Sequence, residues 1–198
     1  MILQSNETSA EASGQINLDS DGFTIRNDNA LRNSNGASYV AWNWKADDNE
    51  PTINTNGSIT SITSVNANAG FSIVKYHGNN SSSGTIGHGL SSAPELIITK
   101  ARNFSAGWPT QAGGSFGIRL NESGANQSGN GNGFYGNTSP TSTVYTVGGS
   151  DETNDDYDYI AYCFHSVAGY SKVGTYTGTG SSNSITTGFK TDFLIVKE

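Results

Sequence analysis

Short runs in which apolar and polar residues alternate recur along the whole chain and predict β-strands. Alternation over four to eight residues is typical of a strand with one buried face. The runs predict strands near 21–26, 38–45, 57–64, 70–77, 84–88, 94–101, 115–120, 142–147, 157–165, 169–177, 183–187 and 191–198. Turn pairs such as Asn35-Gly36 and Gly148-Gly149 separate them. Only residues 1–12 carry a weak helical pattern, so we expect an all-β fold with antiparallel sheets.

The sequence also repeats itself, and the repeats predict the domain organisation. Four pairs of segments match: 22–25 with 144–147, 39–44 with 159–164, 69–74 with 168–173, and 95–100 with 192–197. The pairs divide the chain into the C-terminal half of a unit (1–46), a linker with a possible strand (47–67), a complete unit (68–167) and the N-terminal half of a further unit (168–198). We expect tandem antiparallel units, each β-sandwich-like or jelly-roll-like.

The two half-units raise the question of what completes them. Residues 191–198 end in the apolar run Phe193-Leu194-Ile195-Val196, which as an exposed strand would invite aggregation. Residues 1–46 are a back half without its front, so we expect 168–198 to pack with 1–46. The partner is either the same chain or a neighbouring copy, and in the second case strand exchange would build a homo-oligomer.

Composition narrows the classes of partner. Of the 198 residues, 33% are hydrophobic and 14% are charged, and the formal net charge is −7. Because binding to nucleic acid depends on Lys and Arg neutralising phosphates, the acidic balance disfavours a nucleic-acid partner. No apolar run approaches the ~18 residues of a membrane span, so membrane insertion is not expected either.

Aromatic residues offer both core positions and candidate sugar contacts. Trp42 and Trp44 share one strand face, as do Tyr162 and Phe164, and we expect all four to be buried, with stacking on sugar rings as the alternative. Trp108 lies in a predicted loop and is the better candidate for a binding aromatic. A carbohydrate site would join it to residues of neighbouring loops, namely Asn79, Asn80, Asn132 and Tyr135.

Acidic residues gather in one further loop, and we considered it as a cation site. Its candidate ligands are Asp151, Asp155, Asp156 and Asp158, since hard cations take several oxygen ligands on flexible loops. Their spacing does not match an EF-hand, and a solvated loop is the alternative.

His88 and Cys163 are expected to be structural. His88 lies between Gly87 and Gly89 without another His or Cys nearby, which favours a hydrogen bond to a turn carbonyl over a catalytic or ligand role. Cys163 is the only cysteine, which excludes an internal disulfide and a cysteine zinc cluster, and its place beside Tyr162 predicts a buried, unpaired thiol. The sequence contains no nucleophile elbow and no phosphate loop, and no pair of carboxylates stands out as a glycosidase site.

Several blocks resemble, in order, a repeat domain of virion proteins from marine tailed bacteriophages that infect cyanobacteria and the SAR11 group. The blocks are DSDGFTI (19–25), YVAWNWKA (39–46), TNGSITS (55–61), AGFSIV (69–74), GHGL (87–90), APELII (93–98), TSPT (138–141) and YIAYCF (159–164). The resemblance implies a non-enzymatic structural protein of the virion, in a tail fibre or surface appendage, that mediates assembly and host attachment. Such a role needs no cofactor. Its partners would be copies of itself, other virion proteins and a host surface glycan. A lectin-like carbohydrate-binding module is the second interpretation, and a polysaccharide depolymerase the third.

Overall fold

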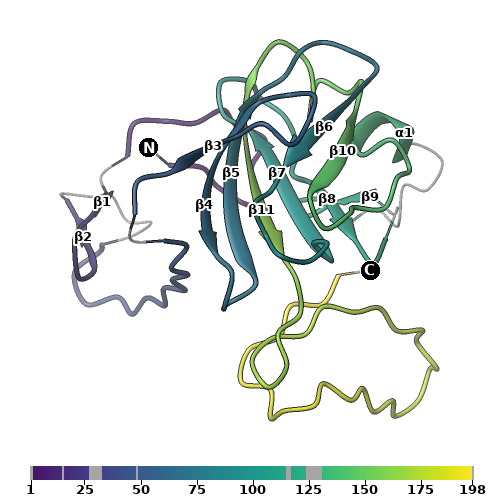
Figure 1. The fold of residues 1–198 in the computed structure, drawn as a ribbon. Helices are drawn as coiled ribbons and strands as arrows, with labels where there is room; N and C mark the ends of the chain where they lie inside the picture. The colour runs from purple at the N-terminus through teal and green to yellow at the C-terminus, as the bar shows by residue number, and fades with distance from the viewer. Residues whose placement is uncertain are drawn as a thin grey trace.

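A seven-stranded antiparallel sheet forms the centre of the computed structural model, which describes residues 2–14, 16–26, 33–47, 49–114, 117–123 and 131–197. In sheet order the strands are β3 (Thr52–Asn54), β4 (Ser61–Asn66), β5 (Phe71–His77), β11 (Asp158–Phe164), β7 (Leu96–Ala101), β8 (Pro109–Ala112) and β9 (Gly117–Arg119). β11 is central because it pairs with β5 on one side and β7 on the other, with Phe164 opposite both Phe71 and Leu96 (Figure 1).

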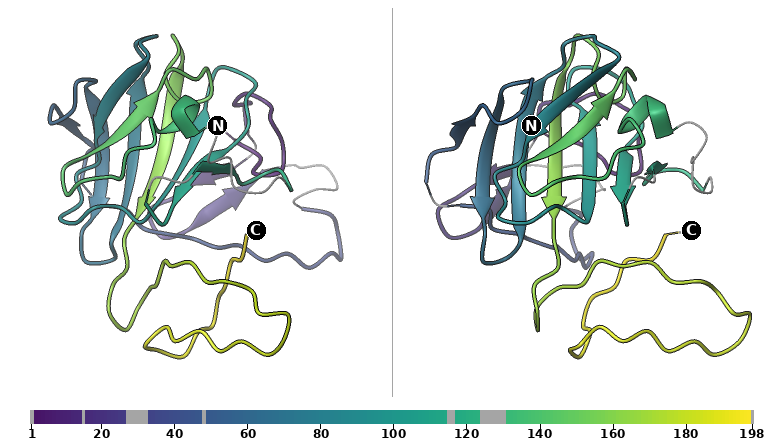
Figure 2. Two further views of the ribbon diagram at one scale, coloured as in Figure 1. Left: turned by 90° about the vertical axis from the view of Figure 1, so that its right-hand side faces the viewer. Right: turned by 45° about the vertical axis from the view of Figure 1, so that its right-hand side comes forward.

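A second antiparallel pair covers one face of this sheet. It consists of β6 (Ser83–Gly87) and β10 (Val144–Gly148), in register from Gly87 opposite Val144 to Ser83 opposite Gly148. Figure 2 shows the pair lying across the larger sheet, next to the single helical turn α1 (Gly131–Phe134). The core lies between the two layers and includes Ile86, Tyr145 and Val147 from the pair and Val74, Ile97, Tyr159 and Ala161 from the larger sheet. Burying each large side chain stabilises the fold by roughly 1.5–3 kcal/mol.

The expectation of an all-β fold with antiparallel sheets is confirmed, and so are most of the strands between residues 57 and 165. Three strands were not predicted: β1 (Ile16–Leu18), β3 and β8, of which β1 pairs only with β2 (Phe23–Ile25) in a separate hairpin. No strand forms in 38–45, 169–177, 183–187 or 191–197, although the sequence predicted one in each, and residue 198 lies outside the described part. The weak helical pattern at 1–12 was also misleading, since residues 2–12 form no helix and Ile2 bridges Ala12 instead.

The two ends of the chain are arranged differently around this core. Residues 4–11 lie against the connection between β7 and β8, where Glu11 N–H donates to the carbonyl of Arg102 (2.6 Å) and Ala106 N–H donates to that of Thr8 (2.8 Å). Residues 168–197 run outside both sheets as extended chain (Figure 1, yellow-green to yellow). Among the described residues α1 is the one helix, and it is too short to cross a membrane.

The tight turn between β4 and β5 requires glycine at its last position, Gly70. Gly70 precedes β5 with a φ of +63°, and a Cβ there would lie 2.6 Å from the carbonyl oxygen of His165. The backbone of His165 is fixed beside Gly70, because its N–H donates to the carbonyl oxygen of Gly70 over 2.9 Å. Only glycine combines this left-handed backbone with so close an approach.

Candidate functional site

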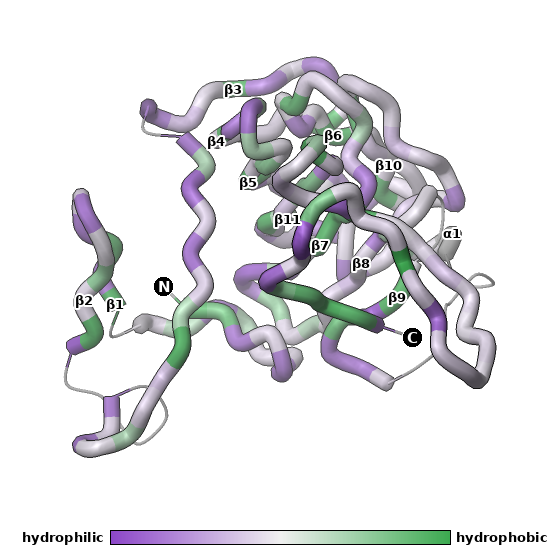
Figure 3. The backbone as a smooth tube through the Cα atoms, turned by 90° about the horizontal axis from the view of Figure 1, so that it is seen from below, coloured by the Kyte–Doolittle hydropathy of each residue, from purple (hydrophilic) through white to green (hydrophobic). Residues whose placement is uncertain are grey.

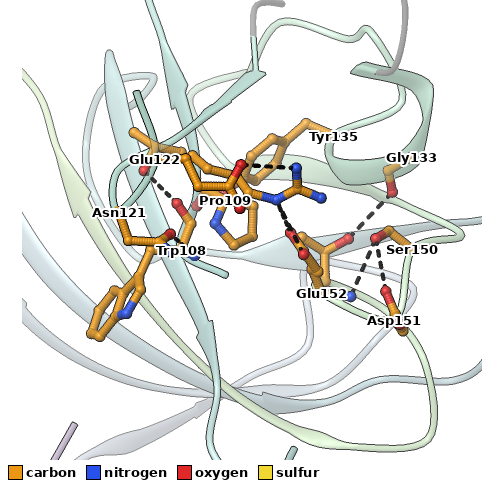
Figure 4. Close-up of polar contacts among 12 residues, drawn as sticks. Trp108, Pro109, Asn121, Glu122, Gly133, Tyr135, Ser150, Asp151 and Glu152 are labelled. Carbon is orange, nitrogen blue, oxygen red and sulfur yellow. Dashed lines mark hydrogen bonds and ion pairs between the residues drawn. The ribbon is translucent and has the colours of Figure 1, made fainter. Parts of the chain in front are cut away.

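Trp108, the expected ligand-binding aromatic, is buried. Its side chain is 5% exposed, and its indole Nε1–H lies 3.1 Å from the carbonyl oxygen of Gln4 and 3.0 Å from that of Glu7. Its own backbone N–H donates to Asn121 Oδ1 over 2.8 Å (Figure 4). The prediction of a ring available for stacking is therefore corrected, because the N-terminal segment covers the ring and takes its polar hydrogen.

Tyr135 is buried as well, at 1% exposure, and organises the core beneath α1. Its hydroxyl lies 2.9 Å from Thr99 Oγ1 and donates to the carbonyl of Pro109 over 2.9 Å (Figure 4). Burial raises the pKa of this phenol, so it stays protonated and acts as a hydrogen-bond donor. The prediction that Tyr135 contacts a sugar is therefore wrong, because its ring is buried like that of Trp108.

The asparagines of the loop between β5 and β6 (78–82) are held by a residue that the sequence did not single out. Asn79 N–H donates to Asn154 Oδ1 (3.1 Å), Asn80 N–H donates to the carbonyl of Asn154 (2.9 Å), and Asn154 Nδ2 donates to the carbonyl of Ser81 (2.9 Å). Asn154 is 1% exposed, so this clasp is internal. The backbone of Asn80 is left-handed, with a φ of +55°. The side chain of Asn132, the remaining predicted contact, lies outside the described part.

The acidic loop 151–158 does not bring its aspartates together as a cation site. In the part of the chain that the structure describes, no group of three or more His, Cys, Asp or Glu side chains is arranged to hold a metal ion. Asp151 accepts from Ser150 Oγ, and Asp155 accepts from the backbone N–H of Asp156. The prediction that Asp151, Asp155, Asp156 and Asp158 together bind a cation is therefore not supported by their arrangement.

Two of these aspartates bind a histidine instead. Nε2 of His77 lies 2.9 Å from Asp156 Oδ1, and its Nδ1 lies 3.0 Å from Asp158 Oδ1. The hydrogen bonds to Asp158 and then Asp156 raise the pKa of His77 above its usual value. The imidazole is half-exposed, and the cluster links the end of β5 to the start of β11.

His88 has the structural role that the sequence predicted. It is fully buried, its Nδ1 accepts from the backbone N–H of Leu90 (3.1 Å), and its Nε2 lies 3.2 Å from the carbonyl oxygen of Thr141. This pair of contacts assigns the proton to Nε2. Burial lowers the pKa of His88, which keeps the ring neutral and holds the Gly87–Leu90 turn against the 141–143 segment.

A polar network beside α1 joins β9 to the 150–154 loop. Nε of Arg119 lies 2.9 Å from Glu152 Oε2, and Nη1 lies 3.4 Å from Glu122 Oε2 (Figure 4). The guanidinium carbon also lies 4.9 Å from the ring centre of Phe134 in α1. These contacts fix the loop that carries Asn154.

A cavity of about 440 Å³ lies on the face of the larger sheet that points away from the core. Its floor is made by side chains of β4, β5 and β11, namely Ile62, Ile73, Ile160 and Tyr162. Charged groups stand at its border: Lys75, and an ion pair between Arg102 Nε and Glu11 Oε2 at 2.7 Å. This cavity combines an apolar floor, one phenol and charged groups. The sequence did not predict it, because its lining residues are far apart in the chain.

Trp42 and Trp44 are exposed rather than buried. Their side chains are 60% and 51% exposed, so the expectation that they are core positions is wrong, whereas Tyr162 and Phe164 lie half-buried in β11. The ring centre of Phe193 lies 5.5 Å from that of Trp42 and 6.4 Å from that of Trp44. The N-terminal and C-terminal segments of one chain therefore touch through aromatic rings, although neither is part of a sheet.

Comparison with protein families gives one match, and it covers residues 1–198. The chain belongs to the DUF7483 family, described as a domain of unknown function. Neither the curated proteins nor the solved structures include a match to this DUF7483 chain. The family name carries no activity, so the function of the DUF7483 chain is argued from its own residues.

Proposed function

We propose that this chain is a non-enzymatic structural component of a tailed-phage virion, placed in a tail fibre or surface appendage on the outside of the particle. It would assemble with copies of itself and with other virion proteins, and take part in host attachment. The sequence resemblance to virion repeat domains motivates the proposal, with tandem sandwich-like units as the corresponding architecture.

The observation that carries the proposal is the repetition of strand sequences on both sides of a well-packed unit. Residues 39–44 precede the two-layer core and repeat its central strand β11, and residues 168–173 follow the core and repeat the turn and start of β5. Repetition of this kind builds extended arrays in which each unit contacts its neighbours. Stiffness suits such a role, and the loops supply it through buried clasps such as Asn154 with Asn79 and His88 with Thr141.

Immuno-electron microscopy tests this proposal. An antibody raised against residues 50–167 should label the tail or an appendage of purified virions of a phage that encodes the chain. Mass spectrometry of the same virions should find its peptides in amounts typical of structural proteins. A chain absent from purified virions but abundant in infected cells would contradict the proposal.

A carbohydrate-binding module is the second candidate, and the cavity on the outer sheet face favours it. Sugar sites combine an apolar or aromatic surface with a few polar groups that fix orientation. Tyr162, Lys75 and the Arg102–Glu11 pair offer this combination around about 440 Å³.

A glycan array separates the second candidate from the first. Lys75→Ala should abolish binding to a positive glycan, while Lys172→Ala, which removes an exposed lysine far from the cavity in sequence, should leave it unchanged. Binding that neither substitution affects would rule out the cavity as the site. Shortening of the bound polysaccharide during the assay would indicate a depolymerase instead.

A further inference from the structure

Two exposed segments of this chain have the sequences of strands but lie outside the sheets. Residues 40–44 repeat 160–164 of β11, and residues 193–196 repeat 96–99 of β7. In both, large apolar side chains face solvent: Val40 is 72% exposed, Leu194 is 71% exposed and Ile195 is 64% exposed. Figure 3 shows the C-terminal stretch as a continuous hydrophobic segment of the tube. Such segments are avoided in the absence of a partner, because they pair with other chains.

The complete unit indicates how these two segments fit one another. In it, β11 lies between β5 and β7, with Phe164 opposite Leu96 and Tyr162 opposite Ile98. Transferring this register to the repeated segments places Trp44 opposite Phe193, Asn43 opposite Leu194 and Trp42 opposite Ile195. On the other side of 39–44, the register of β5 places Trp44 opposite Tyr170.

The backbone of the C-terminal segment already has two features of the complete unit. Gly70 and its counterpart Gly169 have φ values of +63° and +74°. Gly89 and its counterpart Gly188 have φ values of +75° and +88°. Both glycines that turn the chain before β5 and after β6 therefore take the same left-handed conformation in the repeat.

Ring contacts bring the two segments together within one chain. The transferred register makes Trp44 and Phe193 direct neighbours across a ladder, and their ring centres lie 6.4 Å apart. Trp42, two residues away on the same strand face, lies 5.5 Å from Phe193. Trp44 also makes an edge contact with Phe164 at the end of β11, which places this cluster next to the complete unit.

We infer that residues 169–175, 39–44 and 193–197 of the same chain, which lie outside the sheets in the structure, close into a further antiparallel sheet, with 39–44 as its central strand. The occupant of the exposed 39–44 segment is thus the chain's own C-terminal segment. The inference goes beyond the proposed function and does not rest on it, because the pairing follows from the register whatever the protein does. Pairing removes two exposed strand edges and covers the apolar side chains that the extended segments leave in water.

Disulfide trapping tests both the register and the choice of chain. The double variant Asn43→Cys with Leu194→Cys puts two thiols opposite each other in the inferred ladder, within the Cα separation that a disulfide requires. Both residues are exposed, so the substitutions do not disturb the core. The control is Asn43→Cys with Ile195→Cys, since Ile195 is one residue further on and points to the opposite face. Cys163 is fully buried and remains in both variants.

Mild oxidation, non-reducing gels and peptide mapping give the readout. The inference predicts a disulfide within one chain for the 43/194 pair, formed several-fold more completely than for the 43/195 pair. Covalent dimers from the 43/194 pair would overturn the assignment to the same chain and indicate strand exchange between copies. Equal trapping of both pairs, or trapping of neither, would overturn the register.

Discussion

The indole Nε1–H of Trp108 lies 3.0 Å from the carbonyl oxygen of Glu7, a residue about one hundred positions earlier in the chain. This contact, together with that to Gln4, holds the N-terminal segment against the connection between β7 and β8. The fully buried Lys100 adds a second tie, since its Nζ donates to the carbonyls of Thr8 (3.2 Å) and Ala101 (3.0 Å). Burial lowers the pKa of Lys100. The two-layer core is therefore tied to residues 4–11, which lie more than forty residues before its first strand, β3, in the sequence.

Trp108→Phe should destabilise the protein by about 1–3 kcal/mol, because it removes the indole hydrogen bonds to Gln4 and Glu7 and part of a buried ring. Urea unfolding measures this change, and faster amide exchange in residues 4–11 should accompany it. Tyr176→Phe is the control, since it removes a polar group from a 52% exposed aromatic and should change stability by less than about 0.5 kcal/mol. Equal stability of Trp108→Phe and the unaltered protein would mean that the indole hydrogen bonds do not hold the segment.

Gly70→Ala should also destabilise the protein, by about 1–3 kcal/mol, because the left-handed backbone and the carbonyl of His165 both exclude a Cβ. Gly178→Ala is the matched control, since a Cβ there meets nothing within 4 Å. Thermal unfolding of the two variants should differ clearly. Similar midpoints for both would count against the strained turn before β5.

The stability contributed by His77 should depend on pH. Asp158 and Asp156 hold the pKa of His77 above its usual value, so the interaction stabilises the folded state fully below about pH 6.5. It is lost as the pH rises through the higher pKa of the folded state. The difference in unfolding free energy between the unaltered protein and His77→Gln should therefore be larger near about pH 5.5 than near about pH 8.5. A difference that does not change with pH would contradict the cluster.

Alkaline pH should unfold the protein cooperatively. Burial raises the pKa of five tyrosine phenols, namely the buried Tyr76, Tyr135, Tyr145 and Tyr159 and the half-buried Tyr162, and raises the pKa of Cys163 to about 12. The unfolded chain releases these phenolic protons near pH 10 whereas the folded chain keeps them, so stability is complete below about pH 10 and falls above it.

Phenolate absorbance and circular dichroism recorded together test this expectation. The four buried phenols should ionise only in the unfolding transition, and Tyr145→Phe should make the loss of stability with pH less steep. Gradual ionisation of all nine tyrosines before any loss of structure would show that these side chains are not enclosed.

The strands that the sequence predicted most accurately are runs rich in apolar residues, and β5 and β11 were predicted to within about one residue. Residues 159–164 of β11 are apolar throughout, so the sequence did not reveal that Tyr159, Ala161 and Cys163 face the core while Tyr162 and Phe164 are only half-buried. β8 was missed because its sequence, Pro109-Thr-Gln-Ala112, is mostly polar, although Thr110 and Gln111 are buried. Burial of a polar side chain depends on partners that periodicity does not reveal.

The candidate site was less predictable than the fold because its contacts join distant residues. Trp108 stands between Gly107 and Pro109 and therefore has the sequence context of a loop aromatic, but residues 4–7 cover it. Asn154 clasps a loop 75 residues earlier, and no local pattern marks it. By contrast, the structural roles of His88 and Cys163 were predictable from their immediate neighbours.

The central claim is the sheet formed by residues 169–175, 39–44 and 193–197. Amide hydrogen exchange of residues 40–44 tests it most directly. A central strand has hydrogen-bonded neighbours on both sides, so these amides should exchange at least about 100-fold more slowly than in an unstructured peptide, which corresponds to an opening free energy of about 2.7 kcal/mol. Deleting residues 190–198 should remove this protection while β11 and β7 stay protected. Exchange of 40–44 at the rate of an unstructured peptide in the intact chain would contradict the account.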